Sequence, residues 1–271
     1  MEWHERDGVR WLAARLPGAT AAFSTRVGGV SDPPFDGLNL GALTDDSVEA
    51  VVENRRRLAT ALGFAPERIA FAHQVHGADL MVAGESSSWP FASADAASAQ
   101  RDRLGPQIFH LHTVSSDVPV AVADGHVISE PGAAALVFVA DCVPVALAGP
   151  GGVAMLHCGW RGLAAGIVAK GVAAVGATDA AVGPSIGPCC YEVGDEVLAA
   201  FESLGADVAN GRMLDLPEVT RRLLRQEGVE RVELSGLCTS CETEHFYSHR
   251  RDNGRTGRQA GLAWLDGTGE G

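Results

Sequence analysis

The chain is poor in lysine: Lys170 is its only one, and arginine supplies the remaining basic side chains. Its 271 residues include 21 basic and 34 acidic side chains, which gives a formal net charge of −13 at pH 7. A surface with this excess of negative charge repels the phosphate backbone of nucleic acids. The charge balance therefore argues against a nucleic acid as the partner.

The sequence also lacks long apolar runs and a secretory leader. No stretch approaches the roughly 18–20 apolar residues that a membrane-spanning helix needs, so we expect no membrane partner. The first residues, MEWHERDGVRW, are charged and contain no apolar segment typical of a signal peptide. Without that signal, the six cysteines are expected to be reduced thiols or metal ligands in a cytoplasmic protein.

Three short apolar runs, at residues 134–140, 143–148 and 153–156, dominate the middle of the chain. Apolar runs of this length that end at Gly, Pro or polar residues are typical of buried strands. Cys142 and His157 stand at the ends of these runs. A thiol and an imidazole at the margin of a core are costly to bury unless something binds them. The pattern therefore indicates that both residues serve a chemical role.

The rest of the chain alternates in part between helical and extended patterns, which predicts an α/β or α+β fold in one domain, residues 1–271. The residues 84–116, rich in Ser, Ala, Asp and Gln, are expected to form a surface insertion, with His110 and His112 exposed near its end. The expected helices are 45–62, 163–175, 195–204 and 216–226, and the further strands are 21–25, 180–182, 229–234 and 258–265. Arg55, Arg56 and Arg57 are expected on a solvated helix face.

A second group of candidate residues lies outside the central runs. His73 and His76 flank Gln74-Val75; in an extended segment they would point to opposite faces, so only one would join a given site. A lone histidine here is more often a hydrogen-bonded turn residue, but Cys142 and His157 give the ligand interpretation more weight.

Four further cysteines form two close pairs in the sequence. The Cys238–Cys241 pair has the spacing of a redox or zinc-knuckle motif, but no second such pair completes a zinc set, so a fortuitous pair in a loop is the favoured interpretation. Cys189 and Cys190 are expected to pack in the core.

Several blocks, taken in order, resemble one family over nearly the whole chain. They are AFSTRVGGVS (22–31), LNLG (38–41), ENRRRL (53–58), QVHGAD (74–79), ADCVPV (140–145), HCGWRG (157–162), GPSIGPCCYEVG (183–194), LCT (237–239) and FYSHRRDNGRTGR (246–258). Together they are similar to the laccase-domain family, also described as purine nucleoside phosphorylases and as peptidoglycan editing factors. The resemblance implies a single-domain, layered α/β sandwich with a mixed sheet.

The resemblance also implies a metal site. The family's ligands map to His76, Cys142 and His157, with Cys142 and His157 also catalytic. Two imidazoles and one thiolate leave a fourth position open on Zn²⁺, as in catalytic sites, and copper is possible with the same donors. Cys158 replaces the alanine usual in the family, and as a strand neighbour of His157 it is expected to point away from the site. His73 is expected to contact the metal ligands at most, and not the metal itself.

The function implied is that of a zinc-dependent purine nucleoside phosphorylase that also deaminates adenosine. Its substrates would be adenosine, inosine, guanosine and methylthioadenosine, with phosphate. Phosphate needs guanidinium and peptide N–H donors, for which Arg26, beside a Gly-rich loop, and Arg161 are candidates. An open metal position suits activation of water for deamination. Asp141 neighbours Cys142, but adjacency in the sequence is poor evidence for a role in proton transfer.

Three other functions remain open from the sequence. A copper-dependent polyphenol oxidase, or laccase, would use the same His and Cys ligands. A Cys–His amidase that edits peptidoglycan precursors would use Cys142 as nucleophile and His157 as base. A binding protein with a structural zinc would use the ligands for stability alone. The sequence does not determine the oligomeric state.

Overall fold

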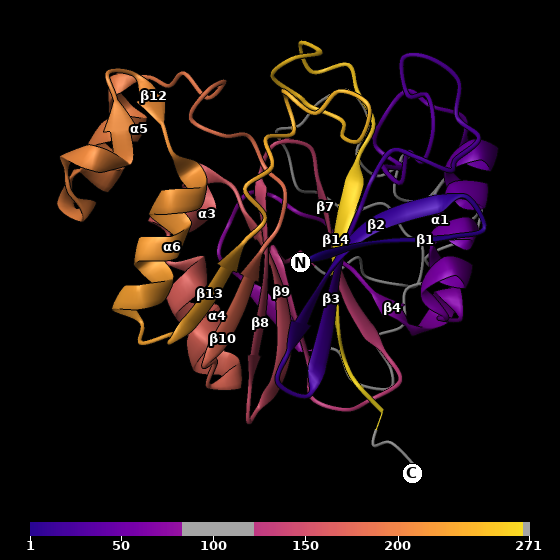
Figure 1. The fold of residues 1–271 in the computed structure, drawn as a ribbon, viewed down its shortest axis with the longest axis horizontal. Helices are drawn as coiled ribbons and strands as arrows, with labels where there is room; N and C mark the ends of the chain where they lie inside the picture. The colour runs from indigo at the N-terminus through magenta and orange to yellow at the C-terminus, as the bar shows by residue number, and fades with distance from the viewer. Residues whose placement is uncertain (83–121, 268–271) are drawn as a thin grey trace, which may run out of the picture.

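Two six-stranded sheets pack face to face in the computed structural model, which describes residues 1–82 and 122–267 (Figure 1). The first sheet has the strand order β1-β2-β3-β14-β7-β4 and the second β13-β10-β8-β9-β6-β5. The first consists of β1 (Glu2–Arg6), β2 (Val9–Leu16), β3 (Ala19–Ser24), β14 (Gln259–Leu265), β7 (Ala134–Val139) and β4 (Ile69–Ala70). The second consists of β13 (Arg231–Leu234), β10 (Asp179–Val182), β8 (Val143–Gly149), β9 (Gly152–Cys158), β6 (Gly125–Ile128) and β5 (Leu80–Val82).

Both sheets are mixed, as the resemblance implied. The pairs β4–β7, β10–β13 and β5–β6 are parallel, and the remaining neighbours are antiparallel. A small third sheet pairs β11 (Ala209–Asn210) with β12 (Met213–Leu214). The α/β sandwich is thereby confirmed, whereas the expected insertion at 84–116, with His110 and His112, lies outside the described residues.

Helices cover the outer face of each sheet, which gives four layers (Figure 1). Helix α1 (Val48–Leu62) lies against the first sheet; α4 (Ile167–Val175) and α6 (Leu216–Gln226) lie against the second. The remaining helical segments are α3 (Trp160–Ala164), α5 (Asp195–Phe201) and 3-10 turns at Pro66–Arg68, Glu202–Leu204 and Ala206–Val208. No helix in the described ranges is long and apolar enough to cross a membrane.

The alternation of side chains along β7 shows why these strands are apolar throughout. Ala135 and Val137 face the core between the sheets, while Ala134 and Leu136 face the core under α1. A strand covered on both faces needs apolar residues at every position. The three apolar runs of the sequence are therefore confirmed as β7, β8 and β9.

Two helix predictions need correction. The expected helix 163–175 is two helices, α3 and α4, because Gly166 adopts a left-handed conformation with φ of 84° between them. The expected helix 195–204 ends at Phe201 and continues as a 3-10 turn. The α1 prediction was close: Ser47 caps it by accepting a hydrogen bond from the Ala50 N–H, and a left-handed Gly63 ends it. The strands β1 and β2 were not predicted.

The expectation of a solvated arginine face on α1 is wrong for Arg55. Its side chain is fully buried, its Nε donates to the Leu40 carbonyl at 2.9 Å, and its guanidinium lies over the rings of Phe71 and Phe138. Burial lowers the pKa of Arg55 to about 9. Arg56, one residue along, is exposed and pairs with Glu53. Only the tertiary fold distinguishes these neighbours.

Replacing Arg55 by alanine should therefore lower the free energy of unfolding by about 3 kcal/mol, because a cavity forms and the Leu40 carbonyl loses its donor. Arg56→Ala is the matched control and should change stability by less than about 0.5 kcal/mol. Urea unfolding followed by circular dichroism measures both. Equal midpoints for the two variants would contradict the structural role of Arg55.

Candidate metal centre

Three segments that are distant in sequence meet at the edge of the second sheet where its central strands β8 and β9 begin and end, respectively. Cys142 immediately precedes β8, and His157 lies near the end of β9; the two strands are antiparallel, with Val143 opposite Cys158 and Pro144 opposite His157. His76 arrives on the loop between β4 and β5. Each of the three side chains offers one ligand atom, and these atoms all lie within 4.8 Å of one another. The structure therefore brings together the three residues that the resemblance selected.

Asp124 organises this edge, although the sequence analysis gave it no role. Its carboxylate is fully buried just before β6, and its Oδ1 lies 2.8 Å from Nδ1 of His157. The same carboxylate accepts the backbone N–H groups of Val75, His76 and Gly77 at 2.7–3.1 Å. Asp124 thus fixes the ring of His157, with Nε2 on the other side of the ring, and also fixes the loop that carries His76.

The loop at His76 has a conformation that requires this support. His76 has a φ of 60°, in the left-handed region that most residues avoid. The imidazole of His76 then meets that of His157 edge to face, with 4.7 Å between ring centroids. His73, by contrast, forms an isolated bridge with Val122 and does not belong to the ligand group, as expected. Because the segment turns at His76, the expectation that an extended segment would point the two histidines to opposite faces does not apply to it.

Two glycines of the HCGWRG block permit this close packing. A Cβ at Gly159 would lie 2.9 Å from the His76 ring and 3.2 Å from the Cys142 sulfur. A Cβ at Gly162 would lie 2.7 Å from the carbonyl oxygen of Gly77. The distances of 2.9 and 2.7 Å are shorter than a Cβ tolerates, so β9 and α3 can pack against the His76 loop only because these positions are glycine.

The electrostatics favour a thiolate at Cys142. Burial opposes ionisation of this thiol, but the charge of His157 and hydrogen bonds from His157 and His76 outweigh it and lower the pKa of Cys142. Burial likewise opposes protonation of His157, but Cys142 and Asp124 together raise its pKa. A thiolate beside two imidazoles, one oriented by a carboxylate, is a donor set that fits Zn²⁺ with a fourth position left for water or substrate.

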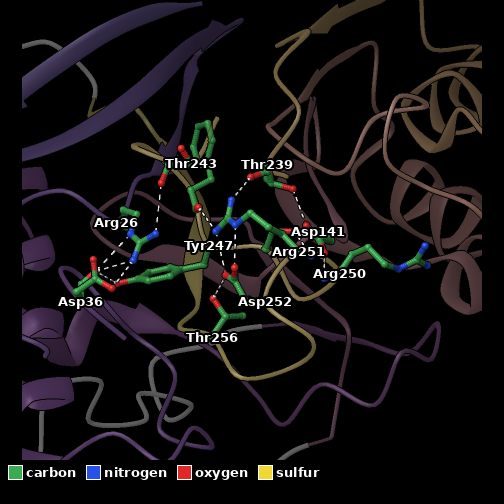
Figure 2. A network of polar contacts seen from close by, with 12 residues as sticks. Arg26, Asp36, Asp141, Thr239, Thr243, Tyr247, Arg250, Arg251, Asp252 and Thr256 are labelled. Carbon is green, nitrogen blue, oxygen red and sulfur yellow. Dashed lines mark hydrogen bonds and ion pairs between the residues drawn. The ribbon is translucent and has the colours of Figure 1, made fainter. Parts of the chain in front are cut away.

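Asp141, the neighbour of Cys142, is engaged elsewhere. It has a φ of 86°, and its two carboxylate oxygens accept the hydroxyl of Thr239 and the backbone N–H of Arg250, both at 2.7 Å (Figure 2). Arg251 extends this network by donating to the Thr239 carbonyl at 3.0 Å. Asp141 therefore anchors the loops of the C-terminal part of the chain beside Cys142.

The two arginines predicted to bind phosphate have different surroundings. Arg26 pairs with Asp36 at 2.6 Å, donates to the Thr243 carbonyl and lies over the ring of Tyr247 (Figure 2). Arg161 is exposed and lies over the ring of Trp160 at the start of α3. It belongs to the same HCGWRG block as the ligand His157. Its role stays a prediction, as does that of Arg26.

Two further residues, Tyr191 and Arg250, share the electrostatic surroundings of this centre; the sequence left open whether the basic run that contains Arg250 reaches the site or is solvated. Arg250 lies over the ring of Tyr191, and both Arg161 and Cys142 act electrostatically on the Tyr191 hydroxyl. Burial, followed by the Cys142 charge, raises the pKa of Tyr191 to about 12. The sequence signal for this group was the run of basic residues at 249–251, which alone cannot be distinguished from a solvated charge cluster.

The other cysteines fall into two environments. Cys158 points into the core beneath the second sheet, as expected, and burial raises the pKa of its thiol well above the usual value. The expectation that Cys189 and Cys190 pack in the core is wrong: Cys189 is exposed, and both lie in a group with Cys238 and Cys241 whose four sulfurs are within 4.8 Å of one another. The sequence offers no second Cys-x-x-Cys pair, but the fold brings the adjacent residues Cys189 and Cys190 to the Cys238–Cys241 pair instead.

Asp124→Asn should weaken zinc binding at His76, Cys142 and His157 by about 10- to 100-fold, because an amide neither orients nor polarises His157 as a carboxylate does. Competition with a chromophoric chelator measures this affinity, in a background carrying Cys189→Ser and Cys241→Ser so that one group is titrated. The control is Asp79→Asn, since Asp79 is exposed and pairs with Lys170. Wild-type affinity in Asp124→Asn would refute the orienting role of Asp124.

Comparison with known proteins identifies the family to which the chain belongs. Residues 20–266 match the family described as multi-copper polyphenol oxidoreductase laccase. The chain is 36% identical over 262 residues to purine nucleoside phosphorylase YfiH of Escherichia coli (strain K12), covering 92% of this chain and 94% of the relative. It is also 36% identical over 273 residues to purine nucleoside phosphorylase PA4543 of Pseudomonas aeruginosa, covering 94% and 98%. The crystal structure of YlmD from Geobacillus stearothermophilus superposes with a TM-score of 0.80 at 33% identity, covering 97% of this chain and 98% of that chain. The chain therefore belongs to the laccase-like family of multi-copper polyphenol oxidoreductases, whose curated relatives are named purine nucleoside phosphorylases.

Proposed function

We propose that this protein is a zinc-dependent purine nucleoside phosphorylase that also deaminates adenosine. Its substrates would be adenosine, inosine, guanosine and methylthioadenosine, which phosphate converts to the free base and a sugar 1-phosphate. The relatives' names support the nucleoside phosphorylase class. The single structural observation that carries the proposal is the convergence of His76, Cys142 and His157 on one point. The cytoplasmic location expected from the sequence belongs to the same proposal.

The protein's own residues have distinct tasks in this proposal. His76, Cys142 and His157 would hold Zn²⁺, which supplies a Lewis acid with one open coordination position when bound. Asp124 would accept the Nδ1 proton of His157 in a hydrogen bond, which would leave Nε2 free to hold the metal. Among the described residues, His76 is exposed while His157 is buried, so a nucleoside would approach the group from the side of His76.

Phosphate would bind on the arginine side of the centre. Arg161 and Arg250 are both exposed, Arg250 lies over the ring of Tyr191, and the charges of both arginines act on the Tyr191 hydroxyl, so their guanidinium groups could receive an anion on this side of the centre. Arg250 is fixed through its backbone N–H on Asp141 and through a hydrogen bond from its guanidinium to the Glu192 carbonyl. Arg26 stays a second candidate, with its charge already shared with Asp36.

A Cys–His amidase is the second candidate function, and one observation favours it. The thiol of Cys142 contacts the imidazole of His157, which in turn contacts the carboxylate of Asp124. A cysteine nucleophile, its base and the acid that orients the base have the same arrangement. That function requires activity without metal and its loss on alkylation of Cys142. A copper oxidase would instead require copper in the purified protein and a visible absorption band.

Incubating the purified protein with adenosine, with and without phosphate, tests the proposed activity. Adenine that forms only with phosphate identifies phosphorolysis, and inosine formed in either case identifies deamination. Cys142→Ala and His76→Ala should each abolish bound metal at this group and nucleoside turnover together, whereas Asp79→Asn should retain both. Normal phosphorolysis in Cys142→Ala protein that has lost metal at His76, residue 142 and His157 would refute the proposal.

Arg161→Ala should raise the KM for phosphate by roughly tenfold or more, because a charge-assisted hydrogen bond contributes about 1.5–3 kcal/mol. The matched control is Arg15→Ala. Arg15 pairs with Asp266, which follows the C-terminal end of β14, and this end of the strand lies far from the centre. Initial rates at varied phosphate concentration measure the effect. An equal KM in Arg161→Ala and Arg15→Ala would remove Arg161 from the phosphate site.

A further inference from the structure

The topology of the second sheet brings four cysteines together outside the centre described above. Strands β10 and β13 are parallel neighbours, with Val182 opposite Leu234, so the loops that follow them leave the sheet at the same edge. The loop after β10 carries Cys189 and Cys190, and the loop after β13 carries Cys238 and Cys241. A bridge between Ser185 and Cys238 continues the parallel pairing into both loops. We call these four residues the cysteine cluster.

The distances within the cysteine cluster match the spacing of ligands around one ion. All four sulfurs lie within 4.8 Å of one another, and Sγ of Cys241 lies 3.4 Å from that of Cys189 and 3.5 Å from that of Cys190. Four thiolates placed tetrahedrally at 2.3 Å from Zn²⁺ are about 3.8 Å apart. The Cys238–Cys241 separation also equals the ligand spacing of zinc knuckles.

The backbone around the cluster is arranged as it is around metal-bound thiolates. The N–H of Gly187 donates to the sulfur of Cys238 at 3.2 Å, and the N–H groups of Ser240 and Cys241 face the same sulfur. Such donors stabilise negative charge on sulfur. Cys189 and Cys241 are exposed, which leaves a path for an ion to enter.

We propose that the cysteine cluster is a second metal site, which binds a structural Zn²⁺ through four thiolates. With four protein ligands the ion has no open position, which is the condition of a structural rather than a catalytic site. Its location indicates what it stabilises. The Ile186 N–H donates to the Asp141 carbonyl and the Thr239 hydroxyl donates to the Asp141 carboxylate, so the two loops joined by the cluster both hold the residue before Cys142.

Metal analysis of four full-length proteins tests the proposal. Wild type, Cys142→Ala, Cys238→Ser/Cys241→Ser and the variant with all three changes are expressed with zinc, and the bound zinc is quantified by mass spectrometry. The decisive comparison is between Cys142→Ala and the triple variant, in which zinc should fall from one equivalent to none. Cys158→Ala is the matched control, because this core cysteine belongs to neither group, and its zinc content should equal that of wild type. Unchanged zinc on loss of Cys238 and Cys241 would overturn the proposal.

A second measurement does not depend on the folding of the serine variants. Full-length Cys142→Ala protein, in which the cysteine cluster is intact, is loaded with Co²⁺ after removal of zinc. Tetrahedral thiolate ligation predicts an intense sulfur-to-cobalt charge-transfer band together with visible d–d absorption, and the absence of both would overturn the proposal. A thiol titration of denatured, unreduced wild type should find all six cysteines free; a deficit of two or four would identify disulfides instead.

These results are independent of nucleoside turnover. Zinc retained by Cys142→Ala and lost in the triple variant would establish the second site even if the protein acted on no nucleoside. Conversely, phosphorolysis could be present in a protein that binds a single zinc, and that outcome would overturn the second site alone.

Discussion

The Asp124 carboxylate accepts hydrogen bonds from the ring of His157 and from three consecutive peptide N–H groups around His76. A buried carboxylate is costly unless its oxygens are paired, and among the described residues these four hydrogen-bond partners all lie within the candidate centre. One buried charge thus positions two ligands that are 81 residues apart, since it fixes one ring directly and the other through its backbone. The left-handed conformation of His76 is tolerated because this carboxylate holds it.

The sandwich explains why the chemistry lies at a sheet edge. The strands β7, β8 and β9 are covered on both faces, so their interior positions are occupied by apolar side chains. Polar ligands can be placed only where these strands end. The antiparallel pairing of β8 with β9 brings the start of one to the end of the other, which sets Cys142 beside His157. The parallel pairing of β10 with β13 does the same for the cysteine cluster.

The two groups at this edge offer different ligands to the metal ions proposed for them. Two imidazoles and one thiolate would leave a position open on zinc, as in catalytic sites, whereas four thiolates would leave none, as in structural sites. Asp141 lies between them, held by the loops of the cysteine cluster and followed directly by Cys142. In the two proposals, a single residue therefore connects the structural site to the catalytic one, and a rigid support of this kind positions a reactive group.

Local sequence determined much of this structure. Apolar runs of strand length are unambiguous when both faces are buried, and Ser47 and Gly63 mark the ends of α1 chemically. The motif residues His76, Cys142 and His157 were also recognisable from the sequence. Tertiary structure alone decided the burial of Arg55, the role of Asp124 and the meeting of Cys189-Cys190 with Cys238 and Cys241. Each of these depends on contacts between segments tens of residues apart, and no local pattern of residues encodes which strand ends become neighbours in a sheet.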